Sequence, residues 1–217
     1  MPLFKNRRDA GRQLAKGLVS YEDHSDVVVL ALPRGGIPVA YEVAMALNVP
    51  LDIFLVRKLG VPGHEELAFG AIASGDVRVL NEEIVWRFNI SEVEIDAVAQ
   101  RELAELQRRE DAYRGNLPAL EIRDRTVILI DDGLATGASM RAAVEGVRAR
   151  KPDQVVVAVP TAAPETCEMF AVMVDEIVCA ETPAPFYGVG RWYQDFSQTT
   201  DEEVRKLLEQ TAQELNP

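Results

Sequence analysis

The sequence predicts an α/β fold in which a central, mainly parallel sheet is flanked by helices. Short apolar runs rich in β-branched residues alternate with helical patterns between about residues 27 and 180. Runs of this composition are typical of strands that are covered on both faces, as in parallel sheets. The alternation indicates right-handed crossovers within one sheet. The 217 residues suit one domain with a sizeable core, or a core with a small subdomain.

The composition excludes several classes of protein. A formal net charge of −12 favours solubility and argues against a surface that coats nucleic acid. The N-terminus lacks an apolar signal region, and no run approaches the roughly 18 uncharged apolar residues of a membrane span. We therefore expect a cytoplasmic protein with no nucleic-acid and no membrane partner. We interpret Cys167 and Cys179 as buried thiols in a reducing compartment, rather than as a disulfide or a metal site.

The predicted elements follow one another closely along the chain. The first is a helix over 7–18 that places Ala10, Leu14 and Leu18 on one face, and we expect its charged face to be solvated. Ser91 and Glu94 form a capping box that begins a long helix with a salt-bridged outer face. Strands are predicted at 27–31, 51–56, 69–73, 77–80, 127–130, 154–159 and 176–180. Helices are predicted at 37–47, 92–113, 140–150, 164–172 and 200–215, a turn at 74–76, and a mobile loop at 59–66.

The stretch 127–139 predicts a ligand site. Its apolar run is followed by Asp131 and Asp132, and then by a loop of Gly, Thr and Ser that leads into a helix. Open α/β sheets bind ligands at the carboxyl ends of their strands, where neighbouring carboxylates can accept hydrogen bonds from a sugar diol. Gly133 and Gly137 permit tight turns, while the amides of a helix N-terminus attract phosphate. A diol and a phosphate together indicate a ribose 5-phosphate.

This order of apolar run, paired aspartates and Thr136-Gly137-x-Ser139 resembles the phosphoribosyl-pyrophosphate (PRPP) signature of the type I phosphoribosyltransferases. The resemblance covers the whole chain in element order. It implies the fold of that family as a single domain, 1–217, with a core at about 20–180. It also implies a small hood subdomain made of 181–200 and the terminal helices. Its substrates would be PRPP and a nucleobase-like acceptor, with Mg2+ carried mainly by PRPP, and we expect a homodimer.

A second loop, Arg34-Gly35-Gly36, follows the strand at 27–31. A fixed positive charge beside exposed backbone amides suits a pyrophosphate group, although the same residues also fit a plain turn. The loop resembles the pyrophosphate loop of the family, which implies a non-proline cis peptide bond, expected between Arg34 and Gly35. In the family a basic residue after the next strand reaches the substrate phosphates. The resemblance assigns that role to Lys58 or to Arg57, and a surface lysine is the alternative.

The family also has a flexible loop that closes over the reaction, and the segment 59–66 corresponds to it. His64, Glu65 and Glu66 are therefore candidates for proton transfer, or else solvated loop residues.

The aromatic segment 182–196 resembles the hood that covers the base in purine phosphoribosyltransferases. Its candidates for stacking on a base are Phe186, Trp192 and Tyr193, and the alternative is that they pack the subdomain or a subunit interface. Asp195 is a candidate magnesium contact, although it follows Val189-Gly190 by one residue more than in the hypoxanthine-guanine enzymes.

The acceptor base stays open. The hypoxanthine-guanine enzymes place an acidic residue where Ala135 stands, which disfavours a 6-oxopurine. The run 134–137 is closer to the adenine and uracil enzymes, although the uracil enzymes lack the second acidic residue found here as Asp132.

The leading hypothesis is an enzyme of nucleotide salvage, a pentosyltransferase that joins a purine or pyrimidine base to the ribose 5-phosphate of PRPP and releases pyrophosphate. Its catalytic residues would be Asp131, Asp132 and Lys58. The residues expected to bind substrate are Arg34, Gly35, Gly36, Gly133, Leu134, Ala135, Thr136, Gly137, Ala138, Ser139, Phe186, Trp192 and Tyr193. One alternative is a regulator that senses PRPP or a nucleotide without catalysis, and another is a sugar-phosphate hydrolase.

Overall fold

Five parallel strands form the central sheet, as the apolar runs predicted. The computed structural model describes residues 2–75 and 77–215. Across the sheet the strands lie in the order β2 (Leu51–Ile53), β1 (Val27–Ala31), β6 (Thr126–Ile130), β7 (Gln154–Thr161) and β8 (Glu176–Glu181). Each neighbouring pair is parallel.

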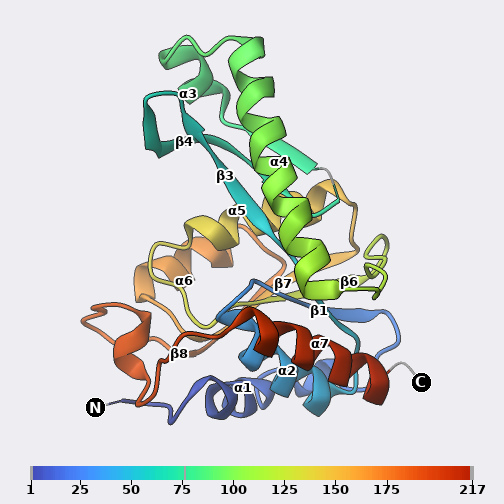
Figure 1. Ribbon diagram of the computed structural model, residues 1–217. Helices are drawn as coiled ribbons and strands as arrows, with labels where there is room; N and C mark the ends of the chain where they lie inside the picture. The colour runs from blue at the N-terminus through green and yellow to red at the C-terminus, as the bar shows by residue number, and fades with distance from the viewer. Residues whose placement is uncertain (1, 76, 216–217) are drawn as a thin grey trace.

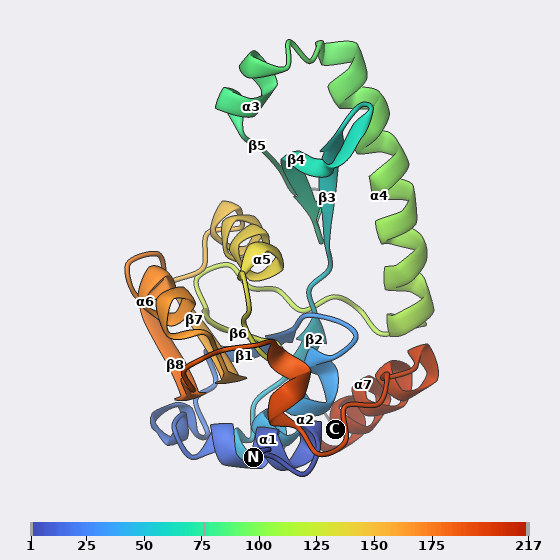
Figure 2. The ribbon, with the colours of Figure 1, turned by 90° about the vertical axis from the view of Figure 1, so that its left-hand side faces the viewer.

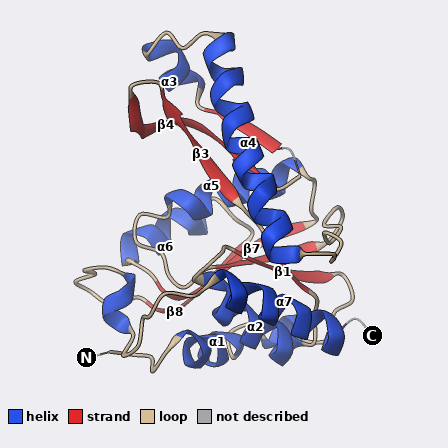
Figure 3. Cartoon of the chain, in the orientation of Figure 1, coloured by secondary structure: helices blue, strands red, loops and turns tan. Residues whose placement is uncertain are grey.

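Helices cover both faces of this sheet (Figures 1 and 3). The helices α1 (Arg7–Ala15), α2 (Gly36–Leu47) and α7 (Asp201–Leu215) pack on one face. The helices α5 (Ala138–Ala149) and α6 (Pro164–Ala171) pack on the other. Alternate residues of β6 therefore enter different core clusters, with Ile128 and Ile130 on the first face and Val127 and Leu129 on the second. Because helices exclude water from both faces of the sheet, the strand is apolar throughout. The parallel sheet covered by helices confirms the predicted α/β class.

Along the chain, the segment between β2 and β6 forms a separate arm, which projects away from the core (Figure 2). It consists of an antiparallel sheet and two helices. Its elements are β3 (Val56–Val61), β4 (His64–Ala73), β5 (Val77–Leu80), α3 (Glu82–Arg87) and α4 (Glu92–Arg114). The capping box at Ser91 begins α4 as predicted.

The prediction of a mobile loop at 59–66 is wrong, because these residues form the end of a β-hairpin, with 59–61 in β3 and 64–66 in β4. Leu59 and Val61 are buried in the same cluster as Ile95 of α4, so the hairpin has its own packed face. The alternation of apolar and polar residues that marks a strand is interrupted here, because the pairing of β3 with β4 shifts register on either side of Gly60. A long helix elsewhere in the chain supplies the partner for this face, which local periodicity does not reveal.

Other boundaries also differ from those predicted. The strand expected at 51–56 divides, since 51–53 joins the central sheet and residue 56 begins the arm. The first helix ends at Ala15 and is followed by the 3-10 turn η1 (Val19–Tyr21). Of the turn expected at 74–76, Asp76 lies outside the described residues. In the described part of the chain, no helix is both long and apolar enough to span a bilayer.

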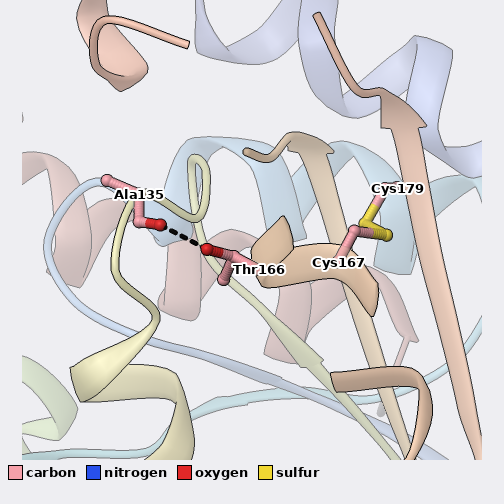
Figure 4. The surroundings of a disulfide bond; sticks show 4 residues. All are labelled: Ala135, Thr166, Cys167 and Cys179. Atoms are coloured by element: carbon pink, nitrogen blue, oxygen red, sulfur yellow. Dashed lines mark hydrogen bonds between the residues drawn. A yellow bond between two sulfur atoms is a disulfide. The ribbon is translucent and has the colours of Figure 1, made fainter. Parts of the chain in front are cut away.

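The prediction of two unpaired, buried thiols is wrong in this structure. Cys167 on α6 and Cys179 on β8 form a disulfide, and both residues are only half-buried (Figure 4). The sequence separation of 12 residues did not indicate the pair. It arises because α6 packs against β8, which brings the two Cα atoms to 6.8 Å.

We expect the disulfide to stabilise the fold by about 2 to 3 kcal/mol, because closing a short loop restricts the unfolded chain. Urea unfolding with and without dithiothreitol measures the difference. The matched control is the double variant Cys167→Ser/Cys179→Ser, whose stability should not respond to the reductant. Two titratable thiols in the native, non-reduced protein would contradict the pairing.

Candidate functional site

The strand order reverses between β1 and β6, and the crevice of an open α/β sheet lies at such a point. The two loops that leave these strands begin side by side, because the amide of Leu32 donates a hydrogen bond to the carbonyl of Ile130 at 2.9 Å. The structure thus brings together the two loops that the sequence singled out, 34–36 and 131–139.

Two glycines let these loops approach each other. A Cβ atom on Gly35 would collide with the carboxylate of Asp132, and one on Gly36 would lie 2.7 Å from the carbonyl of Ile130. The glycine pair is therefore required by packing, whatever it binds. The non-proline cis bond lies between Pro33 and Arg34, one bond earlier than expected. Gly35 is already in helical conformation as the residue before α2, so the irregular backbone precedes it.

Arg7 is a site residue that the sequence analysis missed. Its Nε donates to Asp132 Oδ2 at 2.8 Å, and its Nη1 donates to the carbonyl of Ser197 at 2.6 Å. The guanidinium also lies 3.9 Å from the ring centroid of Phe196. The face of α1 was expected to be solvated, which is wrong for Arg7, whose side chain is 11% exposed. Helical spacing is the signal that indicates this arginine, because Arg7 precedes Ala10 by three residues and Leu14 by seven and so lies on the buried face of α1.

Burial sets the protonation of the paired carboxylates. It raises the pKa of Asp131 well above its usual range, and the neighbouring charge of Asp132 raises it further. Burial also raises the pKa of Asp132, although Arg7 opposes this shift. Both groups therefore hold their protons more tightly than free carboxylates do. A ligand that donates hydrogen bonds or carries a cation would favour their ionised form.

The loop after Asp132 is held from behind by the core. The amide of Leu134 donates to the carbonyl of Thr161, and the Thr166 hydroxyl donates to the carbonyl of Ala135 at 2.6 Å (Figure 4). Gly137 takes a left-handed conformation, with φ of +70°, immediately before α5. Arg141 donates the first backbone bond of that helix, so the amides of 138–140 precede the helical ladder and are suited to an anion.

A cleft of about 770 Å³ separates the arm from this loop. Thr136 and Ala138 line it on one side and Lys58 and Glu66 on the other. Lys58 was expected at the edge of the central sheet, which is wrong, because β3 belongs to the arm; its side chain nevertheless faces the cleft. Arg57 is bound to Glu102 of α4 by its Nε at 2.9 Å.

The hood segment reaches the same site through Tyr193. This residue is buried, and its hydroxyl donates to the carbonyl of Asp132 at 2.6 Å. Phe186 and Trp192 lie with ring centroids 6.2 Å apart and are half-buried. The Trp192 indole N–H is buried and has no hydrogen-bond partner within the described residues.

Several candidates do not converge on the paired carboxylates. Asp195 is exposed and accepts a hydrogen bond from the amide of Ser197. His64 and Glu65 are exposed at the start of β4 in the arm. Across residues 2–75 and 77–215, no three acidic, histidine or cysteine side chains cluster as metal ligands.

Comparison with known proteins identifies the family. The family model of the phosphoribosyl transferase domain matches residues 4–184. The chain belongs to the phosphoribosyl transferase family. The match includes both loops of the crevice, and the predicted resemblance is thereby confirmed.

Relatives of this phosphoribosyl transferase chain are known in bacteria. Two curated proteins of Mycobacterium tuberculosis, from strains CDC 1551 and H37Rv, are both named "Putative phosphoribosyl transferase" and are 46% identical over 215 residues. The match covers 99% of this chain and 48% of each of them, so the chain spans about half their length. The solved structure of TT1426 from Thermus thermophilus is 41% identical with a TM-score of 0.86, and the match covers 97% of this chain and 99% of that one.

Replacing Arg7 should destabilise the protein by about 2 to 3 kcal/mol, since Arg7→Gln removes a charged hydrogen-bond partner from Asp132. The pKa of Asp132, already raised, should rise further. Protonation then relieves the unpaired charge at low pH, so the difference in stability should be larger at pH 8 than at pH 5. Urea unfolding at both pH values measures it. The control is Arg12→Gln on the same helix, and an equal loss in both variants would contradict the role of Arg7.

Proposed function

We propose that this chain transfers the ribose 5-phosphate of PRPP to a nitrogenous base and releases pyrophosphate. One observation carries the proposal: the carboxylates of Asp131 and Asp132 and the anion-suited loop 133–139 lie beside the Arg34-Gly35-Gly36 loop at a single crevice. A 5-phosphate site, a diol acceptor and a pyrophosphate site are then adjacent, in the order in which PRPP carries these groups.

The chemistry follows from the charge that develops in the reaction. As the C1–O bond to pyrophosphate breaks, the ribose becomes positively charged and the leaving group gains negative charge. Ionised Asp131 and Asp132 would hold the diol and stabilise the cationic sugar. Arg34 would stabilise the leaving group, and Lys58 could reach it from across the cleft when the arm and the core close on the substrate.

Mg2+ fits this site as a companion of the substrate. Magnesium is commonly held by one or two carboxylates together with substrate phosphates, and the crevice offers two carboxylates. When bound, the ion would neutralise charge on the pyrophosphate group. Asp195 stays a candidate for a further contact through water.

The acceptor base would lie between the crevice and the hood. Phe186 and Trp192 are the aromatic side chains that we propose to stack on it, and Tyr193 instead holds the hood against Asp132. Ala135 offers no acid or base, so the class of base is left open. A homodimer is a further expectation.

The activity can be tested by incubating the protein with PRPP, Mg2+ and a panel of purines and pyrimidines, with pyrophosphate release as the readout. Asp132→Asn should lower turnover at least about a hundredfold, because it removes a charge that stabilises the transition state. Asp96→Asn, an exposed aspartate on α4, is the control and should behave as the wild type. PRPP binding without pyrophosphate release for any base would favour a sensor, and phosphate release without a base would favour a hydrolase.

PRPP affinity should increase with pH, because a diol binds the ionised form of the carboxylates whose pKa values are raised. Protons are then released on binding until the pH exceeds those raised values. Calorimetry at pH 5.5 and pH 8, in buffers of different ionisation enthalpy, measures both effects. Phosphate groups also titrate, at about pH 6, and this contributes to the pH dependence of PRPP binding. Inorganic pyrophosphate, which has phosphate groups but no diol, is the matched ligand that measures this contribution. An equal pH dependence for both ligands would refute this role of the carboxylates.

A further inference from the structure

The helix α4 returns from the arm to the core, and its last turns pack against α7 (Figure 2). Two small cavities open beside these turns, and both are lined by Arg109. The first, of about 140 Å³, is also lined by Pro33, Asp131 and Ser139. The second, of about 150 Å³, is also lined by Arg34. Arg109 therefore lies where the two cavities meet, next to both residues of the cis peptide bond.

The carboxylates that pair with Arg109 and with Arg34 can be displaced by a bound anion. Its Nε donates to Glu105 Oε1 at 2.7 Å, and Arg108 donates to the same carboxylate. These hydrogen bonds lower the pKa of Glu105 to about 2, so this half-buried carboxylate is ionised at any physiological pH. On the other side of the second cavity, Arg34 is paired with the exposed Asp201 at 3.4 Å. Exposed ion pairs contribute little free energy, and a multiply charged anion can displace them.

Arg109 is better placed than its neighbour for such a ligand. Its side chain is 41% exposed and lines both cavities, whereas that of Arg108 is 67% exposed and lines only the second. The sequence analysis interpreted both arginines as part of a solvated helix face. The packing of α4 above the 32–34 loop gives one of them a second role.

We propose that Arg109 is a substrate-binding residue that contacts the pyrophosphate group together with Arg34, with which it lines the second cavity. The inference rests on the proposed function and adds an element of the arm to the site. In the structure Glu105 holds the guanidinium. When the substrate binds, the pyrophosphate oxygens replace this carboxylate, and α4 covers the leaving group. In the second cavity Arg109 lies with Arg34 and with no residue of the 133–139 loop, so we place its contact at the pyrophosphate end of the substrate and not at the 5-phosphate.

The test compares three ligands by calorimetry in the presence of Mg2+: inorganic pyrophosphate, ribose 5-phosphate and PRPP. Arg109→Gln should weaken the binding of pyrophosphate and PRPP at least about tenfold, which is the loss of one charged hydrogen bond. Ribose 5-phosphate should bind within about twofold of the wild-type affinity. Arg109→Lys, which keeps the charge, should recover part of the pyrophosphate affinity.

The matched control is Arg101→Gln, an exposed arginine on α4 that lines neither cavity, and it should bind all three ligands as the wild type does. Unchanged pyrophosphate binding by Arg109→Gln would overturn the inference. An equal loss for all three ligands would also overturn it, because that pattern indicates a general disturbance of the site. Failure of the wild type to bind PRPP would instead refute the proposed function, so the two failures are distinguishable.

Discussion

The structure of the site depends on the burial of two neighbouring carboxylates at the end of β6. Burial favours the protonated form of both carboxylates, so their ionised form needs hydrogen-bond donors close by. The neighbouring backbone must also leave room for the two side chains. Gly35 and Gly36 leave the space, because any side chain at these positions would meet the 130–132 backbone or a carboxylate. Arg7 donates the charged hydrogen bond, and Tyr193 binds the adjacent carbonyl. Three distant parts of the chain are thus held at one point.

The loop 133–139, which we propose to bind phosphate, is supported by the half of the core that lies beyond β6. Its carbonyls and amides pair with the end of β7, and Thr166 of α6 binds Ala135 from behind. The disulfide beside Thr166 attaches the same helix to β8. On the opposite side of the cleft the arm contributes Lys58, and α4 places Arg109 next to Pro33 and Arg34. The proposed ligand site therefore lies between the core and the arm.

Much of the core and of the crevice could be predicted from local patterns. Val127–Ile130 and Val27–Ala31 are apolar throughout because helices cover both faces, and this signal is visible within a few residues. The loops that follow them carry their chemistry in consecutive residues. In contrast, the partner of Arg7 lies 125 residues away, and Cys167 meets Cys179 only because α6 packs against β8, so their roles could not be predicted from neighbouring residues. The hairpin at 59–66 was missed for the same reason, because α4 supplies the buried partner of Leu59.

By itself the sequence determined the class of fold, the family and the two loops of the crevice, because strand composition and contiguous motifs are local properties of the chain. Only the tertiary structure decided which charges surround the carboxylates, where the cis bond lies, how the cysteines pair and which side of the cleft holds Lys58. These features depend on segments meeting across the sheet and the arm. Arg7 and Arg12 are the same residue type on one helix, and only the structure shows that the first is buried against Asp132 while the second is exposed.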